Sequence, residues 1–215
     1  MLAALGALLI SGTAWAQNSG TVNDAFQTAR QAVKPELQTK VVSLYGIGTP
    51  SVIQKWYIIF YDPSVSSHGR AVLVEGNQIS KTYPANGGAT YSAALSFDPS
   101  RITSEGPALS AAQGYAAKHD IAYDSVRVLL KQTDAKKPFR WRVELLDVGK
   151  SQGFVYVNAL DDTVAAYASP ASEKKSLSSI TDSSAQGFGD QVKNTFLGIG
   201  GDLEEFFTGE RTVDK

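Results

Sequence analysis

The sequence predicts an α+β protein made of two repeated modules, each with one helix packed on a three- to four-stranded antiparallel sheet, plus a C-terminal helical tail. Three observations support this prediction. A Trp-led apolar run occurs twice with an offset of 85 residues, a helical pattern precedes each copy, and residues 185–215 space their apolar side chains by three or four. The repeat indicates that one folding unit occurs twice in the chain.

Each repeat is expected to begin with a helix. The first starts near Thr21, where a capping pair follows, and stops before Pro35. The second starts near Ser104 and ends near His119. Both precede β-rich sequence, so the expected order within a repeat is helix and then strands.

Three strand candidates follow each helix. The middle one begins with a basic residue and a Trp, continues with an apolar run and ends with Asp. A polar stretch containing Gly then leads to a further β-branched run, as expected for a hairpin. The candidates are residues 39–45, 55–62 and 71–74 in the first repeat and 125–131, 140–147 and 155–157 in the second.

The middle strand of the first repeat is apolar on both sides. One side faces the predicted helix, and the opposite side carries Tyr57, Ile59 and Tyr61. Soluble monomers rarely expose so much contiguous apolar surface. Three interpretations follow: the other repeat covers this side, the C-terminal segment covers it, or it is a recognition surface. Cover from within the chain is favoured.

The predicted boundaries divide the chain into six segments. Small residues at Ala14 and Ala16 follow a short apolar run, which is typical of a secretory signal, although a buried N-terminal helix is the alternative. The segments are a signal peptide (1–16), a first module (21–84), a linker (85–103), a second module (104–168), a Ser-rich linker (169–184) and an amphipathic helical tail (185–215).

Composition excludes several classes of site. The chain has no Cys, so disulfides and thiolate metal sites are impossible, and 20 basic against 21 acidic residues leave no excess charge for nucleic acid. The two histidines, His68 and His119, lack ligand spacing. Asp161 and Asp162 are interpreted as a turn, with calcium binding as a minor alternative. We expect no metal, no cofactor and no catalytic residue.

The two helix-and-strand units over residues 21–168, each with its Trp-led strand, turn, Gly and second β-run, resemble tandem PepSY-like domains. Such modules occur in propeptides of thermolysin-like metalloproteases and in free-standing envelope proteins, and similar tandem units form a secreted inhibitor of β-lactamases. The resemblance implies a sheet surface that grips another protein, often to restrain an enzyme. No protease domain follows in this chain, and the tail lies outside the resemblance.

The expected function is therefore that of an exported, non-enzymatic protein-binding module, periplasmic or extracellular, with no transmembrane segment after signal cleavage. Restraint of a secreted or envelope enzyme such as a peptidase is one version. The alternatives are a structural or assembly protein of the cell envelope that uses the Phe-rich tail, and an uncharacterised hydrolase. The candidate protein-binding residues are Tyr57, Ile59, Tyr61, Arg140, Arg142, Phe196, Phe206 and Phe207.

Overall fold

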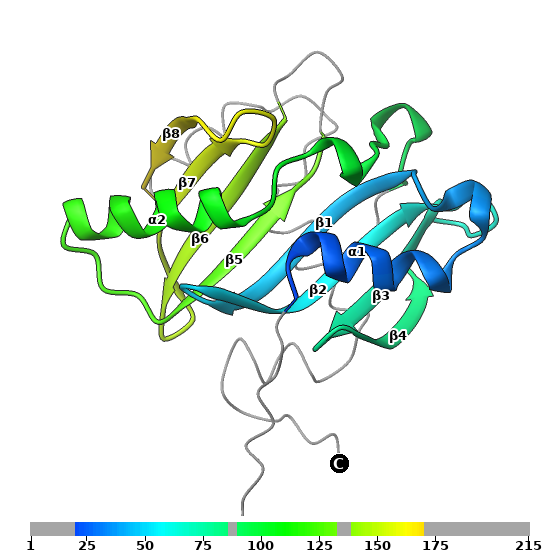
Figure 1. Ribbon diagram of the computed structural model, residues 1–215, viewed down its shortest axis with the longest axis horizontal. Coiled ribbons are helices and arrows are strands. Elements are labelled where there is room, and N and C mark those ends of the chain that lie inside the picture. Colours follow the sequence, from blue (N-terminus) through cyan, green and yellow to red (C-terminus); the bar gives the residue numbers. More distant parts are fainter. Residues whose placement is uncertain (1–19, 86–89, 133–138, 170–215) are drawn as a thin grey trace, which may run out of the picture.

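The computed structural model describes residues 20–85, 90–132 and 139–169. They form one antiparallel sheet of eight strands in the order β4-β3-β2-β1-β5-β6-β7-β8, with both α-helices on the same face (Figure 1). The strands are β1 (Val41–Thr49), β2 (Val52–Tyr61), β3 (Gly69–Glu75), β4 (Gln78–Pro84), β5 (Ser125–Leu130), β6 (Arg140–Asp147), β7 (Lys150–Asn158) and β8 (Val164–Ala168).

The predicted fold class is wrong. The sequence predicted two modules, each a helix on its own small sheet, whereas the structure is dominated by one continuous eight-stranded sheet with only two short helices. The reason is the antiparallel pairing of β1 with β5, which runs from Leu44 opposite Leu130 to Gly48 opposite Val126. This pairing joins the first strands of the two repeats, so no sheet edge separates them. Local sequence patterns do not show which distant strands pair.

Helix α1 (Val22–Ala29) begins where the sequence predicted. Thr21 and Asp24 form a capping box, in which the backbone N–H of Asp24 donates to Thr21 Oγ1 at 3.3 Å and the N–H of Thr21 donates to Asp24 Oδ2 at 2.9 Å. The helix ends earlier than predicted because the chain tightens into 3₁₀ turns. These turns are Arg30–Ala32 and Pro35–Leu37, and two more, Ala93–Leu95 and Pro99–Arg101, lie between β4 and α2.

Helix α2 (Gly106–Lys118) crosses β6 and β7 on the same face as α1 (Figure 1). Its first turn contains Pro107, a position where the missing N–H costs little. The buried side of the helix is built mainly from small residues, Ala108, Ala112 and Ala116, together with Leu109. Small side chains let the helix lie close to the strands below it.

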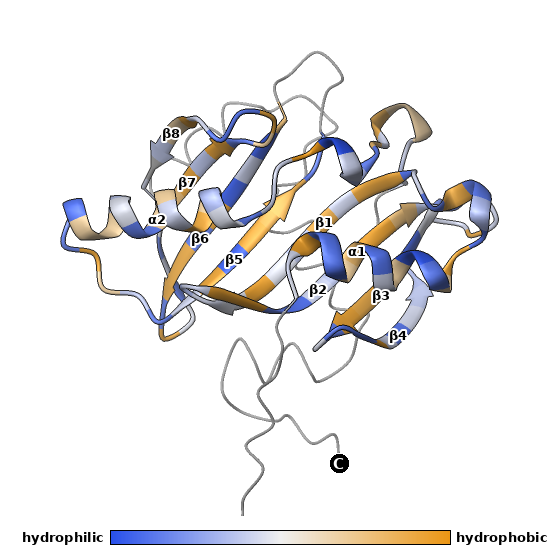
Figure 2. Ribbon diagram, viewed as in Figure 1, coloured by the Kyte–Doolittle hydropathy of each residue, from blue (hydrophilic) through white to orange (hydrophobic). Residues whose placement is uncertain are grey.

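A single hydrophobic core lies between the sheet and the two helices. Trp56 of β2 and Trp141 of β6 both point into it, with their ring centroids 6.3 Å apart and an interplanar angle of 61°. Neither indole Nε1 has a hydrogen-bond partner, so the edge-to-face contact compensates only in part for burying these donors. Figure 2 shows the hydrophobic residues concentrated along the central strands. The two Trp-led runs thus meet in one core.

Gly46 of β1 makes room for Trp56. The two residues are opposite each other in the β1–β2 ladder, and Val128 of β5 is opposite Gly46 on its other side. A Cβ atom at Gly46 would lie 2.7 Å from Ile53 Cγ2 and from Val128 Cγ2, and 2.8 Å from Trp56 Cζ3. Glycine at this position is therefore required by packing.

The turn between β6 and β7 holds a β-branched residue in a left-handed conformation. Val148 has a φ of +45° and Gly149 a φ of +72°, and the Val148 side chain is 80% exposed. Its N–H donates to Asp124 Oδ2 at 3.2 Å. The corresponding conformation in the β3–β4 turn is adopted by Gly76 and Asn77, residue types that tolerate it. Val148 is the only β-branched residue among the described non-glycine residues with positive φ, so its backbone conformation is strained.

We predict that Gly46→Ala lowers the free energy of unfolding by about 1–3 kcal/mol, because the added methyl group overfills a closed part of the core. Gly114, on the exposed side of α2, is the matched control, since a Cβ there meets nothing within 4 Å. Gly114→Ala should raise stability by up to about 1 kcal/mol. Urea unfolding of both variants measures the difference. Equal stabilities would contradict the packing of Gly46.

We also predict that Val148→Asn raises the free energy of unfolding by about 1 kcal/mol, because Asn enters the left-handed region at lower cost than a β-branched residue. Thermal unfolding should show a higher midpoint. Val148→Thr keeps the branched Cβ and serves as the control, so it should give no gain. A stabilisation shared by both variants would show that backbone strain at this turn is not its cause.

Candidate functional site

Exposed large hydrophobic side chains gather at one edge of the sheet. Leu160, Val164 and Tyr167 are 66%, 43% and 49% exposed and lie within or just before β8. The other exposed ones in the described ranges are Ile79 on β4 and Val148 in its turn. We use the name β8 edge for strand β8 together with Leu160. It is the most apolar part of the exposed surface that the structure describes.

An aromatic stack fixes one residue of the β8 edge. The ring of Tyr167 lies on that of Tyr115 from α2, with centroids 4.3 Å apart and planes 10° apart. His119 packs on Tyr115 in turn at a centroid distance of 4.4 Å. A ring held in this way loses little conformational freedom when it binds a partner. The sequence suggested no role for this stack because its members come from a helix end and a strand that was not predicted.

The two outer strands of the sheet differ in how they are protected. Within the described part of the chain β8 pairs only with β7, and its residues include no charged side chain and no proline. The opposite outer strand, β4, carries Lys81 and ends at Pro84. Charges and prolines at an outer strand discourage pairing with another chain. By this criterion β4 is guarded, that is, protected against pairing with a strand of another chain, and β8 is not.

The predicted binding residues of the first repeat lie on the face of the sheet opposite the helices. Tyr57 and Ile59 are only 3% and 2% exposed, and Tyr61 is partly exposed. The Tyr57 ring lies 5.9 Å from that of Tyr45, and burial raises the pKa of Tyr45. We call this side the second face. Its role in binding stays a prediction.

Two further residues of the predicted binding set, Arg140 and Arg142, also point to the second face, but their environments differ. Arg140 is exposed, and its Nε donates to Asn158 Oδ1 at 3.3 Å. The guanidinium carbon of Arg142 lies 4.1 Å from the centroid of the Phe154 ring. Arg142 Nη1 is also 3.9 Å from Glu144 Oε2. Strand β6 therefore presents one solvated and one largely covered cation.

The sequence missed the importance of Arg127, which completes this charged cluster. Its Nη1 lies 3.5 Å from Glu144 Oε2, and the side chains of Arg127, Arg142 and Glu144 are only 17%, 16% and 12% exposed. Arg142 and Glu144 alternate along β6 with Trp141 and Val143, a sequence pattern typical of a strand with one side in solvent. Cross-strand register, which puts Glu144 between Arg127 and Phe154, explains why these charges are largely buried instead.

Several predictions fall outside the described residues. They are the signal peptide (1–16), the Ser-rich linker (169–184) apart from residue 169, the amphipathic tail (185–215) and the binding residues Phe196, Phe206 and Phe207. The remaining predicted binding residues are brought to one side of the sheet but not into a single exposed patch.

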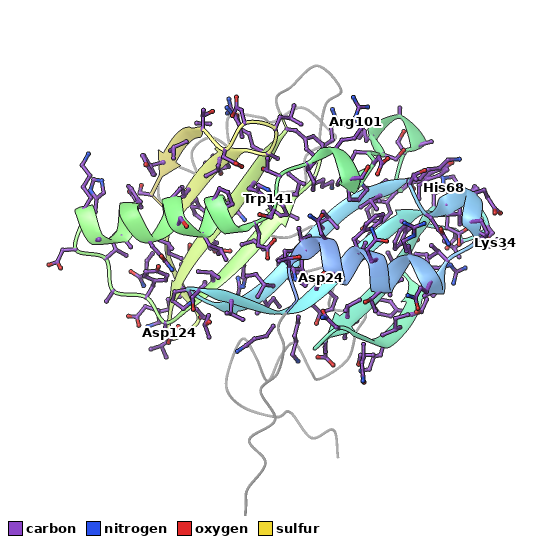
Figure 3. All side chains as sticks on the ribbon, in the orientation of Figure 1. Asp24, Lys34, His68, Arg101, Asp124 and Trp141 are labelled. Atoms are coloured by element: carbon purple, nitrogen blue, oxygen red, sulfur yellow. The ribbon has the colours of Figure 1, made fainter. Side chains whose placement is uncertain are left out.

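The two histidines of the chain lie far apart in the described structure. His68 lies at the opposite end of the molecule from the end of α2, where His119 is the C-cap (Figures 1 and 3). Asp62 binds Ser64 and Arg70; burial disfavours its charge, but these hydrogen bonds prevail and lower its pKa to about 2. No group of three potential metal ligands occurs within residues 20–85, 90–132 and 139–169.

The paired carboxylates at Asp161 and Asp162 lie in a turn. Asp161 Oδ1 accepts hydrogen bonds from the backbone N–H of Thr163 at 3.0 Å and from Thr163 Oγ1 at 2.7 Å. Asp162 adopts a left-handed φ of +60°. The predicted turn is confirmed, and it leads the chain into β8.

Glu105 is a buried carboxylate where the two helices begin. It is 7% exposed, it is the N-cap residue of α2, and its Oε2 accepts the N–H of Val22, the first residue of α1, at 3.1 Å. Burial raises the pKa of Glu105, and the hydrogen bonds from backbone N–H groups offset this effect only in part. One side chain therefore links the two repeats on the helical side of the sheet.

Compared with protein-family models, with curated proteins and with solved structures, the chain has no match in any of the three. Among the described residues, neither helix has the length and apolar character needed to cross a bilayer. The candidate site therefore rests on the geometry of this chain alone.

We predict that the Glu105 carboxylate makes stability fall as the pH rises. Because the folded pKa lies above the ordinary value of 4.5, the folded state binds a proton that the unfolded state has released. The free energy of unfolding should therefore decline from pH 4.5 up through the raised pKa, and Glu105→Gln should lack this component. Urea unfolding at a series of pH values measures it.

Glu75 provides a control, because its contribution to stability should change with pH in the opposite direction. Burial opposes its charge, but its ion pair with Lys55, at 2.9 Å, and further hydrogen bonds lower its pKa. Its contribution is present above pH 4.5 and is lost as the pH falls through the lowered pKa. A Glu105→Gln effect that is independent of pH, or that has the same sign as Glu75→Gln, would contradict the prediction.

Proposed function

We propose that this protein is an exported, non-enzymatic binding protein that takes up an extended segment of another protein along the β8 edge. The observation that carries the proposal is an outer strand without charge or proline that exposes its own Val164 and Tyr167 and is preceded by exposed Leu160. Recognition would use strand addition, in which backbone hydrogen bonds give affinity and alternate side chains give specificity.

The chemistry of the β8 edge favours an apolar segment. Val164 and Tyr167 are opposite Val157 and Val155 of β7, two core residues on the helical side of the sheet. A ninth strand would therefore find apolar neighbours on that side, including the Tyr115–Tyr167 stack. Tyrosine is enriched among residues that dominate binding energy. An uncharged segment with an aliphatic or aromatic residue at alternate positions fits best.

The proposal includes restraint of a secreted or envelope enzyme such as a peptidase. That version is supported by the resemblance to PepSY-like modules drawn from the sequence, and it requires that the segment held at the β8 edge belong to the enzyme. Binding through β8 does not depend on the resemblance, because it rests on the exposed edge itself. Binding at the β8 edge and restraint of an enzyme can therefore be tested separately.

We predict that peptides selected from a library of extended sequences bind the mature chain at the β8 edge. Binding should slow hydrogen exchange of β8 amides at least tenfold, because new interstrand hydrogen bonds protect them. The double variant Val164→Asp with Tyr167→Ala should lose at least tenfold in affinity, measured by fluorescence titration with the selected peptides.

Ser80→Lys on the guarded strand β4 is the matched control and should leave the affinity unchanged. Peptides that protect β4 amides, or that bind the double variant as well as the parent chain, would refute strand addition at β8. Sedimentation over a range of protein concentrations tests whether the strand comes from a second copy. If the chain forms a dimer and the double variant abolishes it, the strand that pairs with β8 comes from a second copy of this chain and not from another protein.

A further inference from the structure

The backbone bonding of β7 determines which groups of β8 face outward. The N–H of Asn158 donates to the C=O of Thr163 at 2.8 Å, on the side of β8. The N–H of the next residue, Ala159, donates to the C=O of Phe139 at 2.9 Å, on the side of β6. Backbone groups alternate in direction along an antiparallel strand. The even-numbered residues of 154–158 therefore direct their N–H and C=O groups to β8, and the odd-numbered ones direct them to β6.

Tyr167 consequently directs its backbone N–H and C=O away from the sheet. It lies opposite Val155, whose bonding groups face β6, so the two residues form a non-hydrogen-bonded pair. Its neighbour Ala166 lies opposite Tyr156, in a hydrogen-bonding position of the ladder. A ninth strand would thus bond to the backbone of Tyr167 and place one of its own residues directly opposite.

The ring of Tyr167 has one face covered by the protein and the other turned outward. Val155, opposite it, belongs to the hydrophobic core, which puts the Tyr167 side chain on the helical side of the sheet. The covering ring is that of Tyr115, at a centroid distance of 4.3 Å, and it comes from α2, which packs on β6 and β7. Tyr115 therefore lies on the inner side of Tyr167. The 49% exposure of Tyr167 agrees with one open ring face, directed to the position of a ninth strand.

An aromatic side chain is the best match for this open ring face. The partner residue opposite Tyr167 would place its Cβ about 4.5–5.5 Å from that of Tyr167, on the same side of the sheet. At this spacing a further ring extends the stack of His119, Tyr115 and Tyr167 by one member. Aromatic pairs contribute more than their buried area alone provides. An aliphatic residue at the same position would gain only the area.

The charge beside the stack disfavours a basic side chain, the other group that binds a tyrosine ring. Lys118 is exposed and lies three residues after Tyr115 on α2, a spacing that makes the two side chains neighbours on the helix. An ammonium or guanidinium group at the open face of Tyr167 would be repelled by Lys118. Strand β8 has no carboxylate to offset this repulsion.

We infer that the segment held at the β8 edge carries an aromatic residue opposite Tyr167, and that stacking of the two rings selects the partner. The inference rests on the proposed strand addition at β8. It narrows the partner from apolar segments in general to extended segments with one aromatic anchor. Tyr115 acts as a positioning residue, because it holds the Tyr167 ring in place.

The probe for this inference is a capped peptide, valine-threonine-X-threonine-valine, in which X and both valines share one side of an extended strand. With phenylalanine at X, the peptide should bind the full chain about three- to tenfold more tightly than with cyclohexylalanine, which has a similar shape but no aromatic ring. Tyr167→Leu should abolish this preference, and Tyr167→Phe should keep it. Ile79→Leu, at an exposed position of the opposite outer strand, is the matched control and should change neither affinity nor preference.

Amide exchange separates failure of this inference from failure of strand addition itself. A bound peptide should slow exchange of the Tyr167 amide at least tenfold and affect the Ala166 amide less, because the Ala166 N–H faces β7. Protection of the Tyr167 amide with equal affinity for phenylalanine and cyclohexylalanine would overturn aromatic selection and leave strand addition intact. A phenylalanine preference that survives Tyr167→Leu would also overturn it. Absence of protection at β8 with every peptide of the series would refute both.

Discussion

The pairing of β1 with β5 is the interaction on which the rest of this structure depends. Five residue pairs, from Leu44 with Leu130 to Gly48 with Val126, join two four-stranded halves without a break. Without them each half would have an outer strand of nearly continuous buried residues facing water. Because the pairing is antiparallel, the halves are related by an approximate two-fold rotation, and both helices arrive on the same side of the sheet.

The rotation also explains why one core serves both repeats. Two rows of paired residues cross the central ladder. In the first, Gly46 lies between Trp56 and Val128. In the second, Leu130 lies between Trp141 and Leu44. The two rows are equivalent in position but not in packing, since a glycine stands where the other row has leucine. The two indole rings therefore meet edge to face across the centre, and Glu105 links the helix starts above them.

Sequence patterns predicted the local elements well. The start of α1 was confirmed because its capping box is a local feature, and the Trp-led strands were found because their β-branched runs are local too. Strands β4 and β8 were missed, since β4 is almost entirely exposed and β8 is short and rich in alanine, so neither has the apolar alternation that signals a strand.

The pairing of β1 with β5 and the burial of the Arg127, Arg142 and Glu144 cluster were beyond the reach of sequence patterns for a different reason. Both depend on contacts between residues far apart in the chain, and no local preference encodes them. Arg127 illustrates the point, because its alternation with Val126 and Val128 is typical of a half-solvated strand. Only the cross-strand register reveals that its partner is Glu144.

A symmetric dimer of one such half would have two identical outer strands, and any feature that guarded one against polymerisation would guard the other. Fusing the halves into a single polypeptide removes that restriction. One border of the sheet carries Lys81 and Pro84, while the other, formed by β8, contains no charged residue and no proline. The two borders of the sheet therefore differ: the proposed strand addition at β8 would extend the sheet on one side, whereas the charge and proline of β4 discourage it on the other, an arrangement that disfavours an open-ended fibre.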